Sequence, residues 1–177
     1  MHEARASRAG RTRSAIIDAF NRLVLERRQR RIRAADAAAE AGVGRSTFYD
    51  HFSGTEQVRL EALSHPFAIL ADAAAGRGDP AALTRLLDHF WEYRARARDH
   101  FSGRAGEQAR RLLAELIEQR LEGELTLPAK LASRQLAEAA LAPVRAWLLG
   151  EAPATPEALA ESLCRSGAAL AASLRRD

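Results

Sequence analysis

The chain has 177 residues, enough for one or two domains with a hydrophobic core of their own. Hydrophobic residues make up 47% of it and charged residues 28%, a globular composition that excludes an intrinsically disordered chain. The single cysteine, Cys164, excludes an intramolecular disulfide framework, and no apolar run approaches the roughly 18 residues of a membrane span. The basic N-terminus lacks the apolar region of a secretory signal, so we expect a soluble, cytoplasmic protein without a membrane partner.

Positive charge is concentrated in the first third of the chain. The formal net charge is +4. Residues 1–60 contain 12 arginines and 7 acidic residues, whereas residues 61–177 contain 15 basic and 16 acidic residues. This distribution predicts that only the first third meets a polyanion.

Helix formers such as Ala, Leu, Arg and Glu dominate the chain, and no alternating strand pattern occurs. The apolar spacing predicts an all-α protein of roughly eight helices. A first helix is expected behind Thr12 or Ser14 as N-cap, and a second helix over about 34–41. Further helices are expected over about 45–51, from 55 to 75, from Asp79-Pro80 until the polar stretch 94–99, and over 107–122, 133–149 and 156–175. Residues 102–106 are predicted to form a loop.

Residues 34–52 match the requirements of a helix-turn-helix. Ala38 is small enough for two helices to cross closely, and Gly42 allows the chain to reverse in a left-handed conformation. Val43 and Phe48 are expected to pack against the first helix, while Phe52 closes the unit. This spacing by itself is a moderate signal, because alanine-rich sequences also match it by chance.

The second helix of this unit would expose polar side chains near its N-terminal end, namely Arg45, Ser46, Thr47, Tyr49 and Asp50. Arginine, serine and threonine are side chains that suit base edges and phosphates, and an α-helix fits the major groove of B-DNA. Double-stranded DNA is therefore the predicted partner.

The stretch Ala41–Phe52, read as AGVGRSTFYDHF, resembles the tetracycline-repressor (TetR) family of bacterial transcription regulators, and the resemblance covers residues 12–65. It implies a DNA-binding domain over 12–58, with the helix-turn-helix at about 33–52. A basic, disordered arm over 1–11 would precede it. A helical ligand-binding and dimerisation domain over 59–177 would follow.

The resemblance also implies roles for individual residues. The start of the recognition helix reads bases in the family, which corresponds to Arg45, Ser46 and Thr47 here. Tyr49 and His51 correspond to phosphate contacts.

Two departures from the family pattern complete the predicted DNA-binding set. Arg33 stands where the family has a threonine N-cap, so a cap worth roughly 1 kcal/mol is expected to be missing. It also ends a basic run that lies beside the reading unit. Thr55 replaces a phosphate-binding lysine, and is expected to donate a hydrogen bond and to cap the next helix.

The second domain offers an aromatic cluster that is either core or ligand pocket. Its aromatic members are His89, Trp91, Tyr93, His100 and Phe101, and Leu116 is predicted to line the pocket with them. The histidines lack metal-ligand spacing, so neither a metal nor a cofactor is predicted. No nucleophile–base pair, phosphate loop or paired carboxylates indicate an enzyme. A sequence-independent architectural DNA protein is disfavoured by the modest basic excess.

The last two helices carry more apolar and small surface than a terminal hairpin needs, which favours a four-helix bundle made by two chains. The predicted interface comprises Val144, Trp147, Leu148, Leu163, Gly167 and Leu170. The sequence therefore predicts a homodimeric repressor that binds a palindromic operator and responds to a small-molecule effector.

Overall fold

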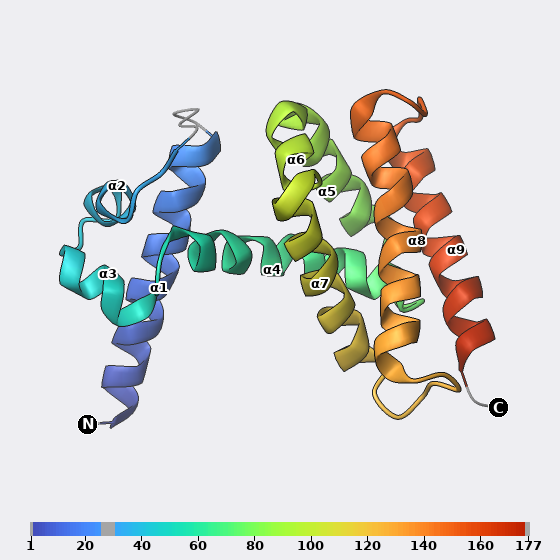
Figure 1. Ribbon diagram of the computed structural model, residues 1–177, viewed down its shortest axis with the longest axis horizontal. Helices are drawn as coiled ribbons and strands as arrows, with labels where there is room; N and C mark the ends of the chain where they lie inside the picture. The colour runs from blue at the N-terminus through green and yellow to red at the C-terminus, as the bar shows by residue number, and fades with distance from the viewer. Residues whose placement is uncertain (1, 26–30, 176–177) are drawn as a thin grey trace. The chain divides into compact units, whose positions relative to one another are not determined.

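The computed structural model describes residues 2–25 and 31–175, with the backbone alone at residues 2–8, 25, 96 and 100. Within these ranges the chain is helical and has no strand, which confirms the predicted all-α class (Figure 1). The helices are α1 (His2–Leu25), α2 (Ala34–Glu40), α3 (Arg45–His51), α4 (Thr55–Ala74), α5 (Pro80–Glu92), α6 (Arg94–His100), α7 (Gly103–Arg120), α8 (Ala129–Leu149) and α9 (Pro156–Leu174).

The chain divides into two compact units, unit 1 over residues 1–63 and unit 2 over residues 64–177. Unit 1 holds α1, α2, α3 and the first part of α4, whereas unit 2 holds the remainder of α4 and α5 to α9. The sequence led us to expect a boundary after residue 58. The two compact units meet after residue 63, within α4, which continues as a helix through Pro66.

The N-terminal arm over residues 1–11, expected to be disordered, is helical from His2 onwards, which corrects that expectation. Its alanines are strong helix formers and no proline interrupts it, so the helix extends N-terminally from the part that packs in the core. The predicted N-caps Thr12 and Ser14 therefore lie inside α1.

Unit 1 has a small core of its own. Apolar side chains of α1 recur at helical spacing and meet alanines of α2, an aromatic side chain of α3, another just after α3, and the start of α4. The buried members are Ile16, Phe20, Leu23, Ala37, Ala38, Phe48, Phe52 and Val58. Because the α2 members are alanines, α2 lies close to α1.

Unit 2 is a helical bundle in which α8 packs against α7 and α9, and α9 also packs against α5. α8 and α9 run antiparallel, side by side (Figure 1). The Asp79 carboxylate accepts a hydrogen bond from the Ala81 backbone N–H at 2.9 Å, with Pro80 at the first helical position. This confirms the predicted start of α5. Thr155 caps α9 in the same way.

The segment between α5 and α7 differs from its prediction. The polar stretch expected to end a helix forms the short helix α6, and α7 begins at Gly103 inside the predicted loop 102–106. Tertiary contacts account for α6, because Ala97 is buried and Arg98 Nε donates to the Leu148 carbonyl oxygen at 2.7 Å. These partners lie too far along the sequence for a local pattern to report them.

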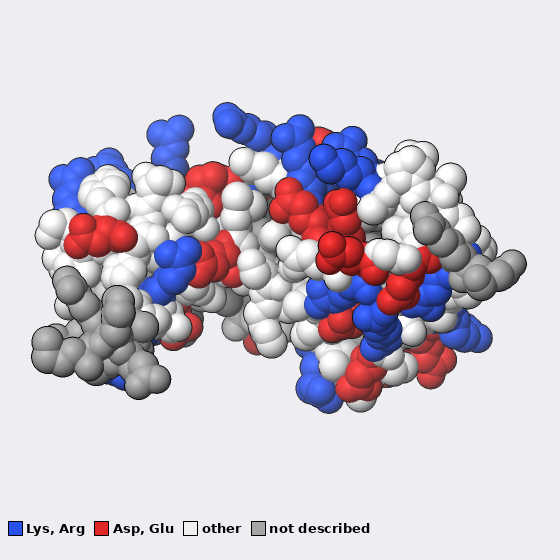
Figure 2. Space-filling model, turned by 90° about the horizontal axis from the view of Figure 1, so that it is seen from below, with Lys and Arg blue, Asp and Glu red and all other residues white. Residues whose placement is uncertain are grey.

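Acidic and basic side chains are interspersed over unit 2 on the face shown in the right-hand part of Figure 2. Ion pairs such as Arg110–Glu107 and Arg110–Glu138 account for part of this mixture. Among the described residues, no helix has both the length and the apolar character needed to cross a membrane.

Candidate nucleic-acid interface

The turn between α2 and α3 has the backbone that the helix-turn-helix pattern requires. Gly42 has φ +67°, a left-handed conformation that glycine adopts without a Cβ clash. The Val43 N–H donates to the Ala38 carbonyl oxygen at 3.0 Å and closes the turn. Ala38 is buried in the core of unit 1. α3 therefore follows α2 after a short reversal.

The start of α2 shows how the missing threonine cap is compensated. Arg33 is the N-cap residue, and its guanidinium has no acceptor for a backbone N–H. The Asp36 carboxylate instead accepts from the Arg33 backbone N–H at 2.9 Å, which is the reverse half of a capping box. The Arg33 side chain is exposed and remains available to a ligand.

α3 carries the polar set predicted to read DNA. Its buried face is Phe48, which anchors the helix in the core of unit 1. Arg45 and Ser46 are exposed and Thr47 is half-buried. Tyr49 is 50% exposed, with its ring packed edge-on against Phe48 at 5.4 Å between centroids. The Tyr49 ring is thus packed against Phe48 on one side, and about half of the residue is open to solvent.

The two remaining members of the predicted set lie at the end of α3 and the start of α4. The His51 side chain is half-buried, and the residue is the last of α3. Thr55 is the first residue of α4. The expected Thr55 cap is replaced by a Ser53–Gln57 pair, in which the Gln57 amide oxygen accepts from the Ser53 N–H at 2.7 Å. Arg33, His51 and Thr55 all belong to unit 1, as do the α3 residues.

Two arginines of α1 hold the ends of the helix-turn-helix helices, a feature that sequence reasoning missed. Arg22 Nε donates to the Glu40 carboxylate at 3.2 Å, and its Nη2 to the Glu40 backbone oxygen at 3.5 Å. Arg13 contacts the other helix end, where its Nη1 donates to the His51 backbone oxygen at 2.6 Å. Each arginine thus binds the last carbonyl of one helix.

Arg13 makes two further contacts within unit 1. Its Nε donates to Glu61 Oε1 at 2.6 Å and its Nη2 donates to Glu61 Oε2, so the pair is bidentate. Its guanidinium carbon lies 4.3 Å from the centroid of the Phe52 ring. The side chains of Arg13 and Glu61 are both only about one-third exposed, at 35% and 30%.

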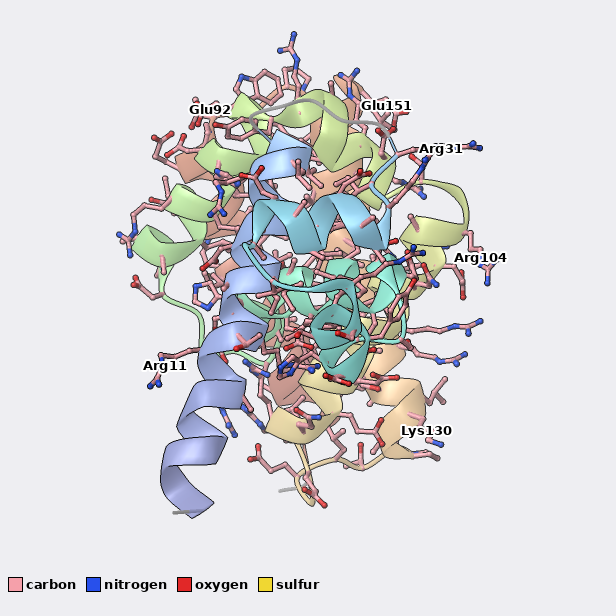
Figure 3. All side chains as sticks on the ribbon, turned by 90° about the vertical axis from the view of Figure 1, so that its left-hand side faces the viewer. Arg11, Arg31, Glu92, Arg104, Lys130 and Glu151 are labelled. Atoms are coloured by element: carbon pink, nitrogen blue, oxygen red, sulfur yellow. The ribbon has the colours of Figure 1, made fainter. Side chains whose placement is uncertain are left out.

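Two further arginines of unit 1, Arg11 and Arg31, are exposed. Figure 3 shows Arg11 extending from α1 and Arg31 from the segment before α2, on opposite sides of unit 1. The residues between Arg27 and Arg30, part of the predicted basic run, lie outside the described residues. Basic side chains therefore lie on more than one side of unit 1.

The residues predicted for a ligand pocket have different environments in unit 2. His89 stacks on Tyr93 at 4.9 Å, and the 40% exposed Trp91 ring packs against Trp147 at 4.8 Å. Phe101 is buried, and Leu116 is half-buried on α7.

Phe101 joins a cluster of buried phenylalanine rings in unit 2. Its ring stacks on Phe67 of α4 at 6.1 Å and meets Phe90 of α5 edge-on at 5.8 Å. It also borders a shallow depression between α7 and α8, whose rim includes Arg110 and Arg145.

The residues predicted as a dimer interface mostly lie inside the single chain. Val144, Trp147, Leu148, Leu163 and Gly167 are buried, and Leu170 is half-buried. The other helices of unit 2 already cover most of this predicted set within the single chain. The outward surface of α8 and α9 is made of different residues.

Cys164 is partly buried between α9 and the turn that precedes α5, close to Gly78. Burial raises the pKa of its thiol, and the nearby Asp79 carboxylate raises it further. The thiol is thus less ionised at neutral pH than an exposed one. Among the described residues, no group of three His, Cys, Asp or Glu side chains is arranged to hold a metal ion.

No known family model matches the sequence, and no curated protein matches it. Solved structures do match. A TetR transcriptional regulator from Streptococcus agalactiae 2603V covers 94% of this chain and 99% of its own, with 22% identity and a TM-score of 0.57. The chain has the fold of the TetR-type regulators.

Two further structures share this TetR-type fold over most of their length. The dihydroxyacetone kinase operon activator DhaS has 20% identity, covers 93% of this chain and 98% of its own, and has a TM-score of 0.54. Thermus thermophilus FadR, a TetR-family repressor in complex with lauroyl-CoA, has 21% identity and a TM-score of 0.51. The match covers 88% of this chain and 92% of FadR. The likeness therefore spans both units of this chain.

Proposed function

We propose that this chain is a cytoplasmic, TetR-type transcriptional regulator that binds a palindromic operator through α3. The observation that carries the proposal is the exposed polar surface of α3, with Arg45 and Ser46 at its start and the half-open Tyr49 ring in its second turn. The buried Phe48 on its other face fixes which side chains face outwards. Base edges and phosphates are the partners that such side chains recognise.

The test is fluorescence anisotropy of labelled DNA from upstream of the gene, titrated with the protein at two salt concentrations. Excess random DNA is present in each titration. Binding that survives the competitor supports a specific regulator. Binding that the competitor removes indicates the sequence-independent alternative, and a selection from random DNA then checks for an operator elsewhere.

We propose that two chains pair through the outward face of α8 and α9. Along the sector where these two helices adjoin, the outward side chains are small, polar or apolar and carry no charge. They are Leu131, Gln135, Ala139, Ala142, Ala146 and Leu149 on α8, and Ala158, Ser162, Ser166, Ala169 and Ser173 on α9. The charged residues of both helices, such as Arg134 and Glu161, lie on the flanking sectors.

A charge-free sector of small side chains on two antiparallel helices favours pairing with a second copy, because helices with small residues approach closely. A two-fold pair would present two copies of α3, which is why a palindromic operator is expected.

We propose that the small-molecule effector acts on unit 2, whose helix α4 continues into unit 1. Among the predicted pocket residues, Phe101 is the one we propose to contact the effector, because its ring stacks on Phe67 of α4 and also lines the depression beside Arg145. A ligand that displaced this ring would contact α4 directly. Only a ligand with different affinities for two arrangements of α4 shifts the regulator between them.

A further inference from the structure

Arg13 holds three parts of unit 1 together. It rises from α1, donates to the carboxylate of Glu61 on α4 and donates to the last carbonyl of α3. Its guanidinium also covers the Phe52 ring that follows α3. The C-terminal end of α3 is thus fixed by one side chain to two neighbouring helices.

The geometry explains why arginine suits this position. A planar guanidinium can satisfy both carboxylate oxygens, a carbonyl oxygen and an aromatic face at the same time. The carbonyl at the end of α3 has no intrahelical partner, and a cation there interacts favourably with the helix dipole. A lysine could make only part of this set.

The charge of Arg13 is matched within the protein rather than offered to DNA. Both Glu61 oxygens accept from it, and the two side chains are about two-thirds buried. The three N–H groups that face Glu61 and the His51 carbonyl oxygen are therefore engaged within the protein rather than open to a phosphate. Arg13 is therefore distinct from Arg45, whose side chain is exposed.

We propose that Arg13, held by Glu61, is a positioning residue that sets the angle of α3 against α4 for operator binding without contacting DNA. The inference rests on the DNA-binding function proposed above. Because Glu61 lies on α4, which continues into unit 2, the pair is also a route by which a displacement of α4 reaches the end of α3. In unit 2, α4 is held by Arg120, which donates to Asp72 and to the Ala68 carbonyl oxygen.

The decisive variant is Glu61→Gln, because its two possible effects have opposite signs. Removal of a negative charge strengthens attraction to DNA phosphates, so electrostatics alone predicts equal or tighter binding. Loss of the bidentate pair releases α3, so positioning predicts weaker binding. The matched control is Asp18→Asn, which removes one negative charge from an exposed position on α1.

We expect E61Q to weaken operator binding about tenfold, which is the size of effect typical when two residues in contact are uncoupled. D18N is expected to bind the operator as tightly as the wild type or more tightly. The slope of affinity against salt stays at the wild-type value, whereas loss of a phosphate contact would lower it by about one. Titrations are run at a temperature at which circular dichroism shows every variant to be folded. Equal affinities for E61Q and D18N would overturn the proposal.

Hydrogen exchange of the free protein gives a readout that does not depend on DNA. In E61Q, amides in the last turn of α3 and at Phe52 are expected to exchange about tenfold faster than in D18N. Amides of α1 should keep the same rate in both. A uniform increase across unit 1 would show a general stabilising role and would overturn positioning.

Operator binding and hydrogen exchange together distinguish the proposed DNA-binding function from the proposed positioning role of Arg13 and Glu61. If the wild type finds no operator in a selection from random DNA, the proposed function fails, and the exchange data still decide whether Arg13 and Glu61 fix α3. If the wild type binds and E61Q matches D18N, the function stands and the positioning role is lost.

Discussion

Gly167 of α9 lies against the backbone carbonyl of Ala73 on α4, so close that a Cβ at residue 167 would overlap that oxygen. Both residues are buried in unit 2. A glycine in the middle of a helix normally weakens it, and here the close approach of two helix backbones accounts for its presence. This contact holds the C-terminal end of α4 against α9.

The Gly167→Ala variant is expected to be less stable by about 2 kcal/mol, because the added methyl forces two packed helices apart. Gly10→Ala is the matched control, since a Cβ there meets nothing within 4 Å. It should be stabilised by up to about 1 kcal/mol through helix propensity. Urea unfolding followed by circular dichroism measures both, and a stable Gly167→Ala protein would contradict the close contact.

Substitutions on the outer face of α3 test the proposed DNA contacts. We expect Thr47→Ala to cost about 1–3 kcal/mol of operator affinity, as loss of a base or phosphate contact does. The control, Ser102→Ala, removes an exposed hydroxyl from unit 2 and should bind normally.

Tyr49 allows a sharper comparison of the ring with its hydroxyl. Tyr49→Phe keeps the ring packed on Phe48, so any loss it shows belongs to the hydroxyl group. If the hydroxyl holds a phosphate, Tyr49→Phe and Tyr49→Ala should weaken binding similarly. Normal binding by both variants in the anisotropy titration would remove Tyr49 from the interface.

The dimer proposal predicts different effects for two exposed alanines of α9. Ala169→Glu places a charge in the uncharged sector beside α8, where pairing would bury it, and should raise the dimer dissociation constant by at least about a hundredfold. Ala172→Glu adds the same charge on the flanking sector and should leave the dimer intact. Size-exclusion chromatography with light scattering measures the molar mass of each variant in solution. Two dimeric variants would rule out this face.

The aromatic core of unit 2 predicts a ligand-sized space when Phe101 is truncated. Phe101→Ala should lower the free energy of unfolding by about 3 kcal/mol, and an apolar cavity of this kind stays dry and binds small aromatic molecules. Indole at saturating concentration should therefore raise the melting temperature of this variant. Trp91→Ala, at a 40% exposed position, should lower the free energy of unfolding by less. Indole should not raise the melting temperature of that variant.

The raised pKa of Cys164 predicts that its thiol is alkylated slowly in the folded protein. The thiolate is the reactive form, so the native protein should react with iodoacetamide more slowly at pH 8 than the urea-unfolded chain. Since the folded pKa lies above the unfolded one, Cys164 stabilises the fold at pH values below the unfolded pKa. That contribution is lost as the pH rises through the folded pKa. Equal alkylation rates in both states would contradict this environment.

Local patterns were enough to define the helix-turn-helix. Gly42 marks a reversal that few residues tolerate, and Phe48 and Phe52 fix which face of α3 is buried. α3 accordingly has the bounds predicted for it, and the all-α class follows from composition and apolar spacing. The same reasoning could not show that α1 begins at His2, since a helix of alanine and arginine depends on what it adjoins.

Only the tertiary structure decided which apolar faces are buried within one chain. The stripe of Val144, Leu148 and Leu163 is apolar in sequence whether it meets its own bundle or a second copy, and the structure buries it inside unit 2. Arg13 and Glu61 are 48 positions apart, so neither residue signals the other locally. Periodicity reports that a helix has an apolar face, whereas the partner of that face is set by how distant segments pack.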